Sequence, residues 1–496
     1  MRRRKAGRTA DWTALAGLLL WTGCASGLSG TSEIPPATGL GSVEAPLSLE
    51  PVVALRDPVA EPAGAATAAS GVASADGSAS LGLTALERRV ASWVDEHRAE
   101  AVEFLERIVN VNSGTMNHAG VREVGRMFAD ELAAIGFETR WIEMPEGVNR
   151  AGHLFAERDG ATGRRVLLIG HLDTVYELDS PFQRYEPLGH GIARGPGVAD
   201  MKGGNVVILY ALKALHAAGA LDGSRILVAL LGDEEETGDP LATSRADLLE
   251  AARRSQAALG FEGGVGGLNT ATIARRGFTG WRLDVTARRG HSSVIFDEEH
   301  GAGAIFEAAR ILHSFYENLS GEPFLTFGPG IILGGTTVTY DPELDRGSAF
   351  GKTNVIPETV TVAGDLRTLS SEQLHRAKAR MQEIVARSLP HASARITFRD
   401  SYPPMAPTPG NEELLARLDR VSRDLGFGPI EPVDPGRRGA ADVSFAAQHT
   451  AALGGLGVVG DGAHTPEETI DLSSLPVMTK RAALLVHRLT AHDPGH

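Results

Sequence analysis

The chain has 496 residues, which is too long for one ordinary hydrophobic core, so we expect two or more folded domains. Its hydrophobic fraction of 42% is that of a globular protein, and its formal charge of -14 argues against a nucleic-acid-binding surface, which would need a basic face. The only cysteine is Cys24, which excludes a disulfide framework and a cysteine-based zinc site.

The N-terminal segment has the features of an export signal. A basic start at residues 1–5 is followed by the apolar stretch 12–21, which is too short to span a bilayer but has the length of a signal-peptide core. Residues 20–24 (LWTGC) resemble a bacterial lipoprotein processing site, in which the cysteine becomes the lipidated first residue. We therefore expect a signal peptide at 1–23, export to the periplasm or cell envelope, and a lipid anchor at Cys24. The alternative is an ordinary cleaved signal whose cysteine is incidental.

The next segment, residues 24–83, is rich in Ala, Gly, Ser, Pro and Thr. It has too few large apolar side chains to offset the entropy of ordering, so we expect a disordered tether. A capped helical pattern begins at Thr84 and places Leu86, Val90 and Val94 on one face. The folded part of the protein is therefore expected to start there.

From residue 84 to about 276, helical patterns such as 205–218 alternate with short apolar runs bounded by glycine. This alternation predicts an α/β fold with a mostly parallel sheet flanked by helices. Runs of this kind occur at 166–170, 226–232, 257–261 and 456–460. They are typical of strands buried on both faces, and in open α/β sheets ligands gather at the carboxyl ends of such strands. We therefore expect the chemistry along one edge of one sheet.

The apolar runs lead to side chains that can bind a metal ion or a proton, and a Gly-rich loop at 195–204 adds Asp200. The residues after the runs are His171 and Asp173, then Asp233, Glu234, Glu235 and Glu236, then Glu262, and finally His464. An isolated acidic run is usually a solvated surface. Its position after a buried strand, together with the other groups, favours metal and base roles.

The pattern changes after residue 276. Strands are expected at 281–287, 331–339, 359–366 and 394–398, and helices at 303–315 and 371–389. This βαββαβ order is that of a ferredoxin-like unit. A helix at 411–425 and the run before His464 then indicate a return to the first sheet. We therefore expect a catalytic domain formed by 84–276 and 402–496, interrupted by a ferredoxin-like domain at 277–401.

These motifs, in this order, resemble a family of zinc exopeptidases and deacylases that includes glutamate carboxypeptidase, acetylornithine deacetylase, succinyl-diaminopimelate desuccinylase and aminoacylase. The resemblance runs from about residue 85 to the end. It rests on an H-x-D motif at a strand end, a Gly-rich loop with an Asp, an adjacent Glu pair, a lone acidic residue a strand later and a C-terminal His. It implies that the inserted domain serves as a lid and in dimerisation, so that the protein is a homodimer.

The resemblance also implies a ligand set for two zinc ions, which Co²⁺ or Mn²⁺ could replace. Asp200 bridges the ions, His171 and Glu262 bind one, and Glu235 and His464 bind the other. Glu234 is then the general base for a water shared by the ions, and Asp173 accepts the free ring N–H of His171. The alternative register uses Glu235 and Glu236 as the base and ligand pair. Family members have a cis peptide after the bridging Asp, here Asp200–Met201.

Three residues of the inserted segment also match family positions. His291 resembles a histidine that reaches the partner subunit's active site or closes over the substrate to stabilise the oxyanion, the alternative being a turn histidine. Asn354 and Arg367 are candidates for binding a substrate carboxylate, although Arg367 could instead be a structural ion-pair partner. Residues 436–442 (GRRGAAD) depart from the Gly- and Ser-rich loop of relatives, which leaves the substrate open.

The resemblance therefore implies a zinc-dependent hydrolase that cleaves the amide bond of N-acyl amino acids or short peptides with a free C-terminal carboxylate, most like glutamate carboxypeptidase. An aminoacylase-type or deacetylase-type deacylase is the alternative among enzymes. An envelope lipoprotein that keeps the fold as a binding module without catalysis is the alternative from another class. The expected partners are a small-molecule or peptide substrate and a second copy of the chain.

Overall fold

The computed structural model describes residues 82–342, 344–437 and 439–491. The expected signal peptide, Cys24 and all of the expected tether up to residue 81 lie outside the described residues, as does Arg438. Within the described part of the chain, no helix combines the length and the apolar character that crossing a membrane requires.

The first helix begins where the sequence predicts it. Thr84 caps α1 (Ala85–Glu96): its hydroxyl accepts the backbone N–H of Glu87, and the Glu87 carboxylate accepts the backbone N–H of Thr84. This reciprocal capping box satisfies donors that the start of a helix otherwise leaves unpaired. Val90 and Val94 are buried, as the helical pattern predicts.

A six-stranded sheet in the order β1-β2-β6-β3-β7-β16 forms the centre of the α/β fold. Its strands are β1 (Glu138–Ile142), β2 (His153–Asp159), β3 (Arg165–His171), β6 (Arg225–Leu231), β7 (Ala257–Gly260) and β16 (Ala452–Leu453). β3 pairs in parallel with β6 and β7, and β7 pairs in parallel with β16, whereas β2 runs antiparallel to β1 and β6. The sheet is therefore mixed but mostly parallel, which agrees with the expected fold class.

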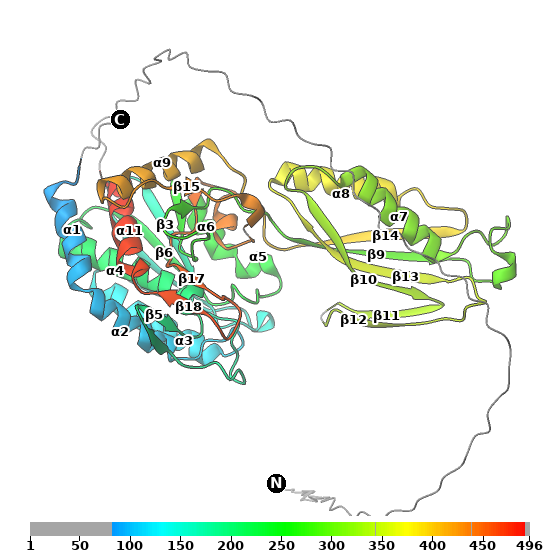
Figure 1. Cartoon of the computed structure of the whole chain (residues 1–496), viewed down its shortest axis with the longest axis horizontal. Helices are drawn as coiled ribbons and strands as arrows, with labels where there is room; N and C mark the ends of the chain where they lie inside the picture. Colours follow the sequence, from blue (N-terminus) through cyan, green and yellow to red (C-terminus); the bar gives the residue numbers. More distant parts are fainter. Residues whose placement is uncertain (1–81, 343, 438, 492–496) are drawn as a thin grey trace, which may run out of the picture. The chain divides into compact units, whose positions relative to one another are not determined.

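Helices cover both faces of this sheet, and α1, α4 and α11 lie together on one side (Figure 1). Besides α1, the helices on that side are α2 (Arg98–Val109), α3 (His118–Ala134), α4 (Gly203–Ala217), α9 (Pro409–Asp424) and α11 (Ser474–Thr490). The other side has α5 (Leu241–Ser244), α6 (Ala246–Arg253) and α10 (Val443–Ala446). Along β3, Leu168 packs in the core on the side of α4 and α11, and Leu167 packs in the core on the side of α6 and α10. Successive strand residues point to opposite faces of the sheet. This double burial explains the continuous apolar runs.

A smaller sheet in the order β17-β18-β5-β4 brings the C-terminal region beside the Gly-rich loop. Its strands are β4 (Glu186–Gly189), β5 (Ile192–Arg194), β17 (Gly460–Asp461) and β18 (Thr469–Asp471), and a separate pair joins β8 (Thr270–Ala271) to β15 (Glu431–Pro432). The run 456–460 is therefore not a strand of the central sheet, contrary to our expectation. The central sheet instead takes Ala452–Leu453, and the chain then turns at Gly455, whose φ of 73° favours glycine.

The segment between the two parts of the α/β fold forms an antiparallel sheet in the order β10-β13-β9-β14, with α7 and α8 along one face (Figure 1). The elements are β9 (Thr279–Ala287), α7 (Ala304–Leu319), β10 (Thr326–Gly335), β13 (Thr359–Arg367), α8 (Ser371–Val385) and β14 (Ala392–Asp400). Chain order and strand order are those of a ferredoxin-like unit, as expected. Trp281, Leu283 and Val285 alternate along β9 and contribute to the core beneath the helices.

The strand expected at 331–339 is divided in two. β10 ends at Gly335, and β11 (Thr337–Asp341) then pairs with β12 (Arg346–Phe350) as a separate hairpin. The returning chain packs on Gly335, where a Cβ atom would lie 2.5 Å from the Phe350 carbonyl oxygen. Only glycine allows this close approach, which the alternation of apolar residues does not reveal.

Candidate metal centre

The predicted ligands come together at the carboxyl ends of β3, β6 and β7. His171 is the last residue of β3, and Glu235 and Glu262 follow β6 and β7. Asp200 lies between two histidines: its Oδ1 is 3.3 Å from His171 Nε2, and its Oδ2 is 3.1 Å from His464 Nε2. His464 Nε2 also lies 3.2 Å from Glu235 Oε2. Residues far apart in the chain therefore form one compact cluster of histidine and carboxylate groups.

Two sets of three side chains have the spacing that a metal ion requires. The ligand atoms of His171, Asp200 and Glu235 lie within 4.8 Å of one another, and so do those of His171, Glu234 and Glu262. Both sets include His171, and His464 contacts the two carboxylates of the first set, Asp200 and Glu235. The Asp200–Met201 peptide bond is cis, as the resemblance implies.

The electrostatics of the cluster fit a bound cation. Burial raises the pKa of Glu234 well above its usual range and raises the pKa of Glu235 to about 7. Hydrogen bonds to Asp200 and Glu235 raise the pKa of His464 to about 10. One buried oxygen of Glu235, Oε1, has no hydrogen-bond partner. The raised pKa values of Glu234 and Glu235 indicate that the cluster has too little positive charge for its buried carboxylates. A divalent ion with oxygen and imidazole ligands would supply that charge.

Glu236 lies outside this cluster. Its side chain is 63% exposed and pairs with Arg150, whose Nη2 is 2.7 Å from Glu236 Oε1. By contrast, Glu234 lies beside His171, with Glu234 Oε2 4.0 Å from His171 Nε2. The geometry therefore favours Glu234 and Glu235, and not Glu235 and Glu236, as the base and ligand pair.

Asp173 lies against the cluster but has a different set of contacts from the one expected. The closest partner of His171 Nδ1 is the backbone carbonyl oxygen of Asp173 at 3.0 Å, while the Asp173 carboxylate is 3.4 Å away. The carboxylate accepts the backbone N–H groups of Glu234 and Glu235, both at 3.0 Å, and the hydroxyl of Thr115 at 2.7 Å. Asp173 thus positions the chain that carries the acidic pair as well as the histidine.

Several supporting residues escaped the sequence reasoning. Arg275 is buried and donates from Nη2 to Glu262 Oε2 at 2.9 Å. Tyr402 donates its hydroxyl to the Glu234 carbonyl oxygen at 2.8 Å, and Glu468 accepts hydrogen bonds from the Asp200 loop. Each of these contacts joins residues that are distant in sequence or lies outside the motifs. Only the unusual burial of charged residues could have indicated them, and burial is not visible in one sequence.

The three candidates in the inserted segment do not form one group within the chain. Asn354 lies beside His291, because the Ser292 N–H donates to the Asn354 carbonyl oxygen at 2.9 Å. Arg367 ends β13, whereas Asn354 precedes the start of that strand. β13 has nine residues, so eight steps of about 3.3 Å separate its ends by about 26 Å. Asn354 and Arg367 of one chain therefore do not bind the same small carboxylate, which corrects the expected pairing.

Arg367 lies near the acidic pair instead. A cavity of about 720 Å³ is lined by Glu234, Glu235 and Tyr402 together with Arg150, Arg367 and Arg399. Arg367 Nε is 2.8 Å from Asp365 Oδ2, and its guanidinium lies 5.2 Å from the centre of the Phe278 ring. The cluster of ligands thus opens into a cavity with basic side chains.

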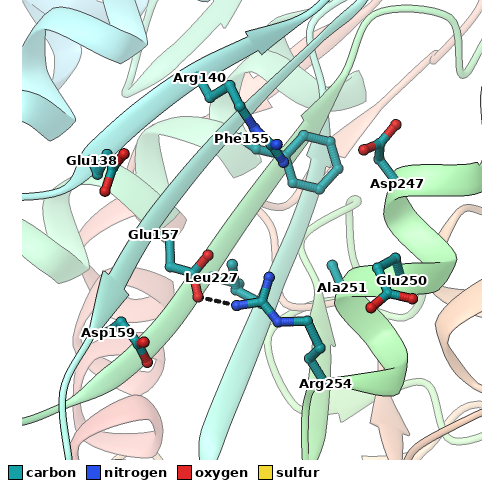
Figure 2. A pocket seen from close by; sticks show the side chains of 10 residues that line it. All are labelled: Glu138, Arg140, Phe155, Glu157, Asp159, Leu227, Asp247, Glu250, Ala251 and Arg254. Carbon is teal, nitrogen blue, oxygen red and sulfur yellow. Dashed lines mark hydrogen bonds and ion pairs between the residues drawn. The ribbon is translucent and has the colours of Figure 1, made fainter.

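Another cavity, of about 360 Å³, lies over β1, β2, β6 and α6 and contains none of the predicted ligands (Figure 2). Acidic and basic side chains line both the strand side and the α6 side of this cavity. Glu157 on β2 pairs with Arg254 beyond the end of α6, and Glu157 also pairs with Arg165 of β3. Because none of the predicted ligands lines this cavity, it is separate from the cluster.

The fold and the cluster define a metallopeptidase or deacylase with a helix-flanked sheet and a ferredoxin-like insertion. Residues 167–488 match the peptidase family M20/M25/M40, and the chain belongs to that family. Carboxypeptidase G2 of Pseudomonas sp. (strain RS-16) is 27% identical over 404 residues, which are 80% of this chain and 91% of that protein. A succinyl-diaminopimelate desuccinylase of Methylobacterium radiotolerans is 26% identical over 435 residues, 81% of this chain and 99% of that protein.

Solved structures agree on the fold. The YXEP protein of Bacillus subtilis, described as a dinuclear metal-binding peptidase of the M20 family, has a TM-score of 0.57 at 14% identity, covering 80% of this chain and 99% of that one. These findings confirm the family resemblance and the fold class.

Proposed function

We propose that the protein is a two-metal hydrolase that cleaves the amide bond of an N-acyl amino acid or short peptide with a free C-terminal carboxylate. The observation that carries the proposal is the cavity that joins Glu234 and Glu235 to Arg150, Arg367 and Arg399. A metal cluster next to guanidinium groups suits a substrate whose carboxylate lies beside the scissile amide, because the planar guanidinium can bind both carboxylate oxygens. The 27% identity to carboxypeptidase G2 supports the same substrate class.

In this proposal two zinc ions would be held by Asp200 together with His171, Glu262, Glu235 and His464. When bound, the ions would supply Lewis acidity at the scissile carbonyl and make an attacking water more acidic. Glu234 takes the proton of that water and delivers it to the leaving amine.

The test compares kcat/KM for an N-acyl amino acid with kcat/KM for its C-terminal amide, using protein loaded with Zn²⁺. We expect strong preference for the acid, because the amide lacks the negative charge that a guanidinium group binds. Arg367→Ala should reduce this preference. Arg282→Ala is the matched control, since Arg282 makes the same kind of pair on the neighbouring strand, with Nε 2.9 Å from Asp284 Oδ2. Equal rates on acid and amide would contradict the requirement for a free carboxylate, and no turnover of any acyl amino acid would favour the binding module.

We also propose that the active enzyme is a homodimer in which His291 and Asn354 act on the partner's site. The separation of Asn354 from Arg367 within one chain supports this arrangement. His291 is exposed, and its ring Nδ1 lies 2.8 Å from Ser293 Oγ. Among the described residues, it is not hydrogen-bonded to any predicted metal ligand. A histidine supplied by the second copy would stabilise the developing oxyanion, a contribution that typically exceeds about a hundredfold in rate.

Mixing two inactive variants tests this proposal. His291→Ala and Glu234→Gln should each be inactive, and subunit exchange should restore up to about a quarter of wild-type activity, because random symmetric dimers include mixed dimers with one complete site. Mixing two different variants of the same site, Glu234→Gln and His171→Ala, is the control and should restore nothing. If both mixtures stay inactive while exchange is demonstrated by labelled subunits, His291 acts within its own chain.

Export and lipid anchoring at Cys24 remain a separate proposal that rests on the N-terminal sequence. Expressed in a bacterium that processes lipoproteins, the wild type should partition into detergent and incorporate a labelled fatty acid. Cys24→Ala should do neither. Equal behaviour of the two proteins would favour an ordinary cleaved signal peptide.

A further inference from the structure

The buried carboxylate of Glu468 holds the loop that carries Asp200. Its Oε1 accepts the backbone N–H groups of Ala199 at 2.8 Å and Asp200 at 2.9 Å, and its Oε2 accepts that of Gly197 at 3.0 Å. Glu468 is 0% exposed, so water does not compete for these hydrogen bonds. A backbone contact adds to them, because the Gly195 N–H donates to the Glu468 carbonyl oxygen at 3.2 Å.

The Asp200 loop needs this acceptor because its backbone is not helical there. Asp200 has φ −116° and ψ 92°, so the N–H groups before it do not all find partners in a regular helical turn. An N–H group buried without an acceptor is costly, and an ionised carboxylate is a stronger acceptor than a neutral oxygen. Glu468 therefore determines where the Asp200 carboxylate can lie.

Glu468 also belongs to the loop that carries His464, four residues earlier in the chain. His464 has a φ of 64°, in the left-handed region that non-glycine residues rarely adopt, and its side chain is 56% exposed. Such a conformation persists only where surrounding contacts hold it. The loop is fastened at Glu468 and again at Thr465, whose carbonyl oxygen accepts the Tyr176 hydroxyl at 2.7 Å.

We infer that Glu468 is a positioning residue that fixes the distance between Asp200 and His464 and thereby sets the affinity of the metal site on the His464 side. The inference rests on the two-metal function proposed above. The other side depends less on Glu468, because His171 ends a buried strand and its Nδ1 is held by the Asp173 carbonyl oxygen. Loss of the hydrogen bonds to Glu468 should therefore weaken the metal site on the His464 side more than the site on the His171 side.

Glu468→Gln keeps the shape of the side chain but places an amide NH₂ where a carboxylate oxygen accepts a backbone N–H. Glu467→Gln is the matched control, since Glu467 is adjacent, has the same charge and has a side chain that is 80% exposed. Tyr176→Phe is a second variant, which removes the hydroxyl that contacts both the Thr465 carbonyl oxygen and Glu468. All three are compared with wild type as the full chain, freed of metal with a chelator and then titrated with Co²⁺.

The readouts are visible absorption and calorimetry. Wild type should bind two equivalents of Co²⁺; if it binds none, the proposed function itself fails. Glu468→Gln should weaken the second equivalent by about 10- to 100-fold, as loss of a supporting contact typically does, with a much smaller change in the first. Tyr176→Phe should shift the second equivalent in the same direction, and Glu467→Gln should match wild type.

Excess Co²⁺ should restore turnover by Glu468→Gln, since the ligands themselves remain in place. Unchanged affinity for both equivalents in Glu468→Gln would overturn the inference. Equal weakening of both equivalents, together with a lower melting temperature of the metal-free protein and no rescue by excess metal, would also overturn it, because that pattern indicates a general structural role. If Glu468→Gln does not fold, the result with Tyr176→Phe decides between these outcomes.

Discussion

The carboxylate of Asp173 accepts the backbone N–H of Glu234 at 3.0 Å. Its second oxygen accepts the next N–H, that of Glu235, at the same distance. One side chain after β3 therefore fixes the backbone of both acidic residues after β6. This contact joins two of the strand ends that carry the cluster.

The first prediction concerns this contact. Asp173→Asn should lower kcat by about 10- to 100-fold, because the asparagine amide would turn an N–H group toward one of the two backbone donors and displace the acidic pair. Steady-state kinetics and metal analysis check the result. Asp179→Asn is the control, since Asp179 is exposed on the same segment. Unchanged kcat in Asp173→Asn would show that the two backbone bonds do not position the base.

The second prediction separates the base from the ligands. Glu234→Gln should lower kcat by about 10²- to 10⁴-fold, the usual contribution of a general base, while retaining two metal equivalents. The adjacent Glu236→Gln should keep normal metal content, because Glu236 lies outside the cluster and pairs with Arg150. Loss of one metal equivalent in Glu234→Gln or in Glu236→Gln would shift the assignment by one residue.

The third prediction concerns the buried ion pairs behind the acidic pair. Arg245 Nη1 is 2.6 Å from Asp233 Oδ1, and its Nε is 2.8 Å from Asp442 Oδ1. Arg245→Met should lower the free energy of unfolding by about 3 to 5 kcal/mol, because two buried carboxylates would then face each other without a cation. Urea unfolding measures this change. Arg253→Met, which breaks an exposed pair with Glu250, should change it by less than about 0.5 kcal/mol.

The fourth prediction is a pH dependence of stability. His153 is buried, with Nε2 2.9 Å from the Ser244 carbonyl oxygen and Nδ1 accepting the Gly232 N–H at 3.1 Å. Burial lowers the pKa of His153 below its usual value, although Asp233 opposes this shift. The unfolded chain therefore binds a proton at higher pH than the folded chain does. The contribution of His153 to stability is fully present above about pH 6.5 and falls by up to about 1.4 kcal/mol per unit as pH decreases below it, until the lowered pKa is passed.

Urea unfolding of metal-free wild type and His153→Gln, at about pH 7.5 and about pH 5.5, tests this dependence. The free energy of unfolding of the wild type should exceed that of His153→Gln by less at the lower pH than at the higher pH. His313→Gln is the control, because the His313 side chain is 69% exposed and should leave the pH dependence unchanged. A constant difference between wild type and His153→Gln would contradict the prediction.

Much of the site could be read from the chain because its signals are local. A buried parallel strand must be apolar on both faces, so the change from apolar residues to His171, Glu234 or Glu262 marks a strand end. The capping box at Thr84 and the alternation along β9 are local in the same sense, and both appear in the structure as predicted. Parallel strand ends meet at one edge of a sheet, which is why the ligands were expected together.

The rest was decided by contacts between distant parts of the chain. Glu468 accepts the N–H of Asp200 from 268 residues away, and Gly335 ends β10 because the returning hairpin packs on it. Neither contact leaves a periodic pattern, since each depends on which segments the fold brings together. The sequence by itself located the strands that end near His171, Glu234 and Glu262, and the ligand types that follow them. The tertiary structure decided the partners that hold those ligands, the loop position of His464 and the separation of Asn354 from Arg367, because these depend on distances between chain segments and not on local preferences.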